Sequence, residues 1–184
     1  MDRLGVFRFA LKGAPMKLTT RLSTLLILGA LGSVAATAAH ARSDAAFMKE
    51  AAQAGNAEVE ASKLAQTKAQ RADVKTFAQT MIDDHTKVGD ELKALAAAKK
   101  VELPTGPSIT QKGELKLIDA GADAKFDERY VKAFGVKAHE DTVKLFEQAA
   151  KEAKDADVKA FAQKTLPGLQ HHLEMARSLQ TAKP

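Results

Sequence analysis

Residues 72–80 have the sequence ADVKTFAQT, and residues 156–164 have the similar sequence ADVKAFAQK, with seven identities in nine positions. Each segment begins a stretch in which apolar residues recur every three, four or seven positions, the spacing of one face of an α-helix. A repeat this short is weak evidence by itself, because alanine-rich helices resemble one another by chance. Together with the periodicity, it favours two related helical hairpins whose second helices begin alike.

The apolar periodicity predicts four long helices, over residues 44–69, 72–99, 124–153 and 156–182. The connection within each pair is short, so each pair is predicted to be an antiparallel hairpin. Pro167 lies inside the last helix and lacks a backbone N–H, which predicts a kink or a loosened turn there.

The connection between the two hairpins is long, covering about residues 100–123. Its first half contains the sequence LPTGP at 103–107, which cannot continue a helix. Ser108 and Gln111 then predict a capping box for a short helix that ends near Gly121. A connection of this length can cross the bundle, so the second and third long helices are predicted to run parallel. The predicted fold is an all-α, ferritin-like four-helix bundle, because one long crossover is typical of that class.

Composition excludes several classes of protein. The chain has no cysteine, which excludes disulfides, thiolate metal sites and a thiol nucleophile. Its net charge of +5 is concentrated near the N-terminus, because residues 1–41 hold five basic residues and one acid. The remaining 143 residues hold 23 basic and 22 acidic residues, a balance of +1. A nearly neutral body argues against a nucleic-acid partner.

The N-terminal segment 1–41 is interpreted as a secretory signal peptide. Lys17 and Arg21 form its positive start, and 22–34 is its apolar stretch. Small residues at Ala39 and Ala41 then predict cleavage before Arg42. Residues 1–15 are read as an upstream extension of the start. The mature domain, 42–184, is predicted to be periplasmic, without a stable membrane span; peripheral association with the outer membrane stays open.

Four polar residues interrupt the apolar faces, one near the middle of each long helix. Antiparallel helices of similar length align at their midpoints, so these side chains are predicted to meet in one layer of the bundle. Three imidazoles and a carboxylate are competent ligands for one divalent transition metal ion such as Zn, Fe, Cu or Mn. The predicted ligands are Glu58, His85, His139 and His172.

Neighbouring residues extend or limit this metal hypothesis. Asp84 and Glu140 are candidate additional ligands or partners of the histidines. His171 points about 100° away from His172 and is predicted to lie at the surface. No histidine has a glutamate three residues before it, which argues against an ordinary di-iron site. A buried hydrogen-bond network that fixes helix register without binding a metal is the alternative interpretation.

Short motifs spread over the mature chain point to a known family. They are GNAE at 55–58, FAQTM at 77–81 with Asp84 and His85, FDERY at 126–130, His139, and LPGL at 166–169 before His172. With these motifs, residues 43–180 resemble a bacterial family of exported helical domains, domain of unknown function 4142, often labelled an outer membrane protein. The resemblance implies a ferritin-like four-helix bundle and leaves the biochemical role unestablished.

Two classes of function follow from the sequence. One is an exported periplasmic bundle that binds a transition metal in its core or acts in envelope stress. The other is a non-catalytic envelope interaction or structural domain, in which the histidine and glutamate layer is purely structural. An enzyme is less favoured, because no acid–base or nucleophile constellation is complete. No motif identifies a partner or an oligomeric state.

Overall fold

The computed structural model describes residues 43–120 and 123–182, which all belong to one compact unit. The predicted signal peptide, 1–41, lies outside the described residues. Within them the chain is helical and contains no strand. No helix of this part of the chain is long and apolar enough to cross a membrane.

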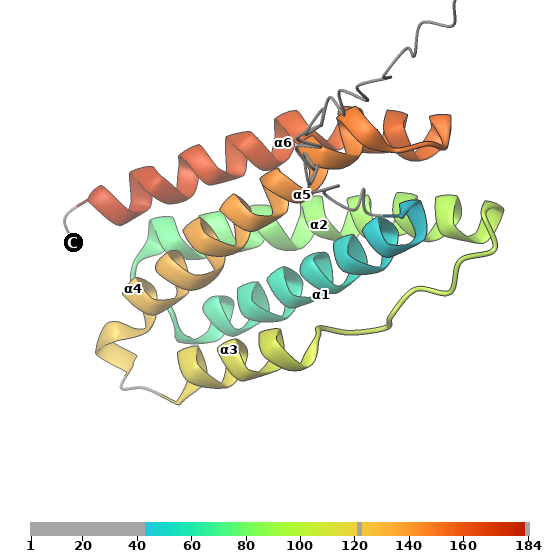
Figure 1. Ribbon diagram of the computed structural model, residues 1–184. Helices are drawn as coiled ribbons and strands as arrows, with labels where there is room; N and C mark the ends of the chain where they lie inside the picture. Colours follow the sequence, from blue (N-terminus) through green and yellow to red (C-terminus); the bar gives the residue numbers. More distant parts are fainter. Residues whose placement is uncertain (1–42, 121–122, 183–184) are drawn as a thin grey trace, which may run out of the picture. The chain divides into compact units, whose positions relative to one another are not determined.

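The described chain forms a helical bundle, which confirms the predicted all-α class. Two antiparallel hairpins, α1 with α2 and α5 with α6, make its main contacts (Figure 1). The third long segment is one run of three helix types, η1, α4 and a π-helix, η2, before α5 begins. The bounds are α1 Asp44–Lys68, α2 Ala72–Ala98, α3 Ile109–Asp119, η1 Asp123–Lys125, α4 Phe126–Tyr130, η2 Val131–Lys137, α5 Ala138–Glu152 and α6 Ala156–Thr181.

Contacts at the two ends of the bundle show that the long connection crosses it. At one end, the Asp127 carboxylate accepts hydrogen bonds from the backbone N–H groups of Gln70 and Arg71, at 2.8–3.2 Å. At the other end, Lys99 pairs with Asp155, at 2.6 Å. The helices α2 and α4 therefore start at the same end and run parallel, as predicted. Figure 1 shows α3 returning alongside α1. The closer ferritin-like assignment stays a prediction.

Local sequence explains the helix boundaries. Ser108 caps α3, and the reciprocal bonds of the predicted capping box with Gln111 are both present. Asp155 caps α6 by accepting from the backbone N–H groups of Asp157 and Val158. Pro167 lies inside α6, which nevertheless runs without a break from Ala156 to Thr181.

Two apolar clusters fill the bundle, and a polar layer separates them. On α2, His85 lies between Met81 of one cluster and Leu92 of the other. On α6, His172 lies between Leu169 and Ala176 in the same way. Both clusters contain aromatic rings; the first contains Phe77, Phe126, Tyr130 and Phe134, and the second Phe47, Phe146 and Phe161. The polar residues therefore occupy one level of an otherwise apolar core.

The π-helix η2 brings the third segment close to α6. A Cβ built at Gly135 would lie 3.0 Å from the Cβ of Ala176, closer than side chains ordinarily approach. An alanine here would force α6 to shift by a few tenths of an ångström, so Gly135 allows the close approach of η2 to the helix that carries His172.

Gly135→Ala is expected to destabilise the protein by about 1–3 kcal/mol, because the added methyl forces η2 and α6 apart. Urea unfolding measures the difference. Gly113→Ala on α3 is the matched control, since its new Cβ would meet no atom within 4 Å. That variant is expected to gain about 0.5–1 kcal/mol from better helix propensity. If the two variants had equal free energies of unfolding, α6 would be able to move away from the added methyl group at no cost.

Candidate metal centre

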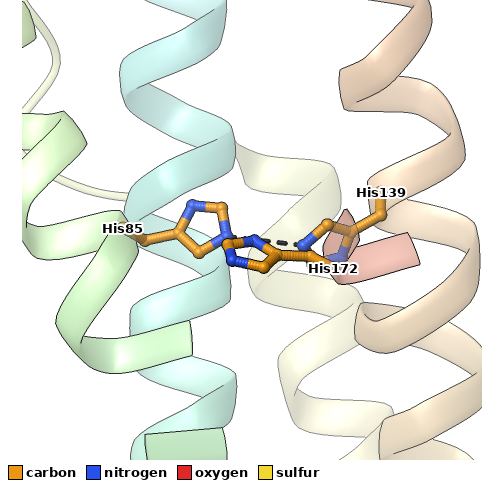
Figure 2. Close-up of side chains that lie close together, drawn as sticks. All are labelled: His85, His139 and His172. Carbon is orange, nitrogen blue, oxygen red and sulfur yellow. Dashed lines mark hydrogen bonds between the residues drawn. The ribbon is translucent and has the colours of Figure 1, made fainter. Parts of the chain in front are cut away.

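The structure brings the four predicted ligands together at the polar layer. Glu58 comes from α1, His85 from α2, His139 from α5 and His172 from α6. All are buried, with 0–5% of each residue exposed. Figure 2 shows the three imidazole rings converging on one point from three different helices. One side-chain nitrogen from each histidine lies within 4.8 Å of one from each of the others.

The Glu58 carboxylate lies against two of the histidines. Its Oε2 is 2.6 Å from Nε2 of His85 and 3.2 Å from Nε2 of His139. Those two nitrogens are themselves 3.4 Å apart. Despite this proximity, Oε2 makes no hydrogen bond of regular geometry with any described residue. Three potential ligand atoms therefore crowd into one small volume.

A backbone carbonyl fixes the orientation of His139. Its Nδ1 lies 2.9 Å from the carbonyl oxygen of Phe134, which only accepts hydrogen bonds. Nδ1 therefore carries a hydrogen, and Nε2 is the ring nitrogen that faces Glu58. A cation at this point, a proton or a metal ion, would attract both Nε2 and the carboxylate.

The π-helix explains why His139 lies on the same face as Phe134. The two residues are five positions apart, a step that an α-helix would rotate by about 140°. In η2 the hydrogen bonds span five residues, as between the N–H of Ala138 and the carbonyl of Ala133. Such π-bulges are frequent at functional sites, where the extra residue redirects a side chain.

A carboxylate fixes the orientation of His172 in the same manner. Its Nε2 lies 2.9 Å from Oδ2 of Asp84, a residue that is half-exposed. The remaining nitrogen, Nδ1, is buried without a hydrogen-bond partner among the described residues. An unpaired buried polar atom is costly, and metal coordination would satisfy it.

The pKa shifts of Glu58 and His172 favour the protonation states that a metal requires, whereas the shift of His85 opposes them. Burial alone would raise the pKa of Glu58, but the charges of His139 and His85 outweigh it and lower this pKa to about 2. Burial lowers the pKa of His172 to about 4, although the hydrogen bond that its Nε2–H donates to Asp84 acts in the opposite direction. At neutral pH Glu58 is therefore an anion and His172 is neutral. Burial alone would lower the pKa of His85, but the adjacent Glu58 carboxylate raises it above its usual value.

The other residues singled out from the sequence have different places. Asp84 contacts His172, as predicted for a partner of a ligand. Glu140 does not reach the layer: it pairs with Arg177 at 2.8 Å on the surface. The reason is helical rotation, since the residue after the inward-facing His139 points about 100° away. His171 is exposed, as predicted.

Two contributions to the layer escaped the sequence prediction. One is the Phe134 carbonyl, because a backbone group carries no sequence signal. The other is Thr142, which is buried with its Oγ1 3.5 Å from Oε1 of Glu58. Its position three residues after His139, on the same helical face, is the signal that could have identified it.

Comparisons with known proteins identify the family and the fold. A family model described as a domain of unknown function (DUF4142) matches residues 30–179. The fold is similar to the crystal structure of a conserved hypothetical protein, rv2844, from Mycobacterium tuberculosis, with 14% identity and a TM-score of 0.59. That match covers 77% of this chain and 92% of the other. No curated protein matches this chain.

Proposed function

The chain belongs to the DUF4142 family, and we propose that it is a metal-binding helical bundle. It holds one divalent transition metal ion between Nε2 of His85, Nε2 of His139, Nδ1 of His172 and the Glu58 carboxylate. The ion lies at the level where the two apolar clusters of the bundle meet.

The spacing of the ligand atoms is the observation that carries this proposal. A tetrahedral zinc ion with bonds of about 2.0–2.1 Å holds its nitrogen ligands about 3.3 Å apart. The Nε2 atoms of His85 and His139 are 3.4 Å apart, and Oε2 of Glu58 is 3.2 Å from the second of them. Oε2 of Glu58 lies only 2.6 Å from Nε2 of His85, so the carboxylate would have to move away from this ring, and the His172 ring would also have to adjust.

The contacts behind the ligands support the same assignment. Metal-binding histidines usually donate their second N–H to a carboxylate or a carbonyl. His172 has such a partner in Asp84, and His139 has one in Phe134. Three imidazoles and one carboxylate suit Zn most directly, and also Fe, Cu or Mn. In this site the metal would add stability to the folded state and join four helices.

Elemental analysis of untagged protein, purified without chelators, tests the proposal. We expect about one transition metal ion per chain, and zinc titrated calorimetrically into the metal-free protein should bind more tightly than about 1 μM. His172→Ala should weaken binding at least about 100-fold. The exposed neighbour His171→Ala should change it less than about twofold. No bound metal, with zinc binding weaker than about 0.1 mM, would assign the layer a purely structural role.

We further propose that the protein acts in the periplasm. The signal-peptide features of 1–41 support this location. N-terminal sequencing of protein from a periplasmic fraction should begin at Arg42 or an adjacent residue. Membrane-bound material that retains Met1 or Met16 would contradict the location without affecting the metal site.

A further inference from the structure

A pocket lies beside the layer of proposed metal ligands. The pocket has a volume of about 560 Å³ and opens between α1 and α2, with Leu103, Pro104 and Thr105 of the crossover along one side. This volume is in the range of small-molecule sites, about 300–1,000 Å³. Its floor contains Phe146 and Leu169 of the core. The pocket therefore extends from the surface into the bundle.

Two glycines make room for this pocket. Gly55 on α1 and Gly89 on α2 both line it, and a Cβ built at either meets no atom within 4 Å. Glycine in the middle of a helix is unfavourable by about 1 kcal/mol relative to alanine. Packing does not require either glycine, in contrast to Gly135. Their effect is to leave open space between the two helices.

The inner end of the pocket reaches the metal layer through His85 and Thr142. His85 is only 5% exposed, and its polar contacts with Glu58 and His139 are both made by Nε2. The other ring nitrogen, Nδ1, has no partner among the described residues, and Figure 2 shows it turned away from the other two histidines. His139 and His172 each have an acceptor for their second nitrogen, whereas His85 lacks one.

We propose that this pocket binds an apolar small molecule with a terminal carboxylate, whose oxygen accepts a hydrogen bond from Nδ1–H of His85. The apolar part lies between α1 and α2, in the space left by Gly55 and Gly89. The ligand carboxylate would accept a hydrogen bond from His85, as the Asp84 carboxylate does from His172. This inference rests on the proposed function in one respect: a metal on Nε2 leaves the ring hydrogen on Nδ1.

Octanoate is the probe for this site, titrated calorimetrically into the zinc-loaded and the metal-free full chain. At a pH above the raised pKa of His85, the neutral ring of the metal-free protein keeps its hydrogen on Nε2, facing Glu58. At such a pH we expect zinc-loaded protein to bind octanoate about tenfold more tightly than metal-free protein, because a hydrogen bond to a charged group contributes about that much. 1-Octanol should bind the zinc-loaded protein about tenfold more weakly than octanoate. Equal binding of acid and alcohol would overturn the carboxylate assignment.

Filling the pocket tests its location. Gly89→Leu should weaken octanoate binding at least about tenfold and leave zinc affinity within about twofold, since Leu is a good helix former. Gly55→Leu should do the same from the opposite wall, and thermal unfolding checks that both variants fold. Gly113→Leu on α3, also in open space, is the matched control. Unchanged octanoate affinity in both folded pocket variants would overturn the proposal.

Two further outcomes separate this inference from its premises. Suppose that the protein binds no zinc, but that it binds octanoate and both pocket variants abolish this binding. That outcome would support the pocket and refute the metal site.

The other test concerns the orientation of the ligand. Lys63 lines the pocket and is exposed, so Lys63→Ala tests whether the carboxylate lies at the outer end of the pocket. We expect less than about a twofold effect. A loss as large as that of Gly89→Leu would place the carboxylate near Lys63 and overturn the contact with His85.

Discussion

Glu58→Ala is expected to destabilise the metal-free protein by about 3–5 kcal/mol, the usual cost of removing one partner of a buried ion pair. Glu58 is 1% exposed, and its Oε2 lies 2.6 Å from Nε2 of His85. Truncation leaves His85 and His139 without the anion they face and also opens a cavity in the core. Urea unfolding at pH 7 in the presence of a chelator measures the loss.

Glu60→Ala is the matched control, because Glu60 lies on the same helix and is exposed. It should change the free energy of unfolding by less than about 0.5 kcal/mol. A double-mutant cycle of Glu58→Ala and His85→Ala then isolates the pair, with an expected coupling of about 1–3 kcal/mol. A Glu58→Ala loss no greater than that of Glu60→Ala would show that the carboxylate is solvated.

The architecture could be predicted from the sequence because local signals agreed with one another. The repeat at 72–80 and 156–164 marks the start of both second helices, and the structure begins α2 at Ala72 and α6 at Ala156. The length of 100–123, with its two prolines and the capping box at Ser108, indicated a crossover with one short helix. These signals are local or depend on chain length alone, so they need no knowledge of packing.

The polar layer could be predicted because midpoints of antiparallel helices align. Glu58, His85, His139 and His172 interrupt apolar faces, and a buried polar group needs a partner. Glu140 was selected for a different reason, its position next to His139 in the sequence, and that selection was wrong. Adjacent residues on a helix diverge by about 100°, so closeness in sequence does not bring a side chain to the same site.

The π-helix could not be predicted from a 3.6-residue period. The buried residues of the third long segment include Tyr130, Phe134, His139 and Thr142, so one step has five residues. An analysis that requires steps of three or four residues passes over the step from Phe134 to His139. The pocket could not be predicted from the sequence either, because the open space beside Gly55 and Gly89 depends on how α1 and α2 pack.

Zinc affinity is expected to fall at least about 100-fold between pH 7 and pH 5. Each proton that must leave a ligand reduces the apparent affinity about tenfold for every pH unit below the pKa of that ligand. Glu58 raises the pKa of His85 above its usual value, so the metal displaces a proton from this imidazole even near neutrality. Calorimetry at pH 7 in buffers of different ionisation enthalpy should detect the released proton. A pH-independent affinity would exclude histidine ligands.

The metal-free protein should show a different pH dependence, with maximum stability near pH 6.5. The pKa of His172 falls to about 4 in the folded state, so only the unfolded chain takes up this proton between pH 6.5 and 4. Stability therefore decreases as the pH falls through this window. The pKa of Glu58 is lowered to about 2, so its contribution is lost below about pH 4.5. The raised pKa of His85 stabilises the fold below about pH 6.5, and this contribution is lost as the pH rises through the raised value.

His172→Gln separates these contributions, because it removes the titrating group that acts between pH 6.5 and 4. Urea unfolding at half-unit steps should show a flatter profile in this window than the wild type, whatever the absolute stability of the variant. His171→Gln should keep the wild-type slope, because the side chain it replaces is exposed. The same slope in all three proteins would mean that His172 titrates as in the unfolded chain, contrary to its burial.

Saturating zinc at pH 7 should raise the melting temperature of the wild type and of His171→Gln. The increase should be far smaller in His172→Gln, because zinc stabilises only the form that binds it.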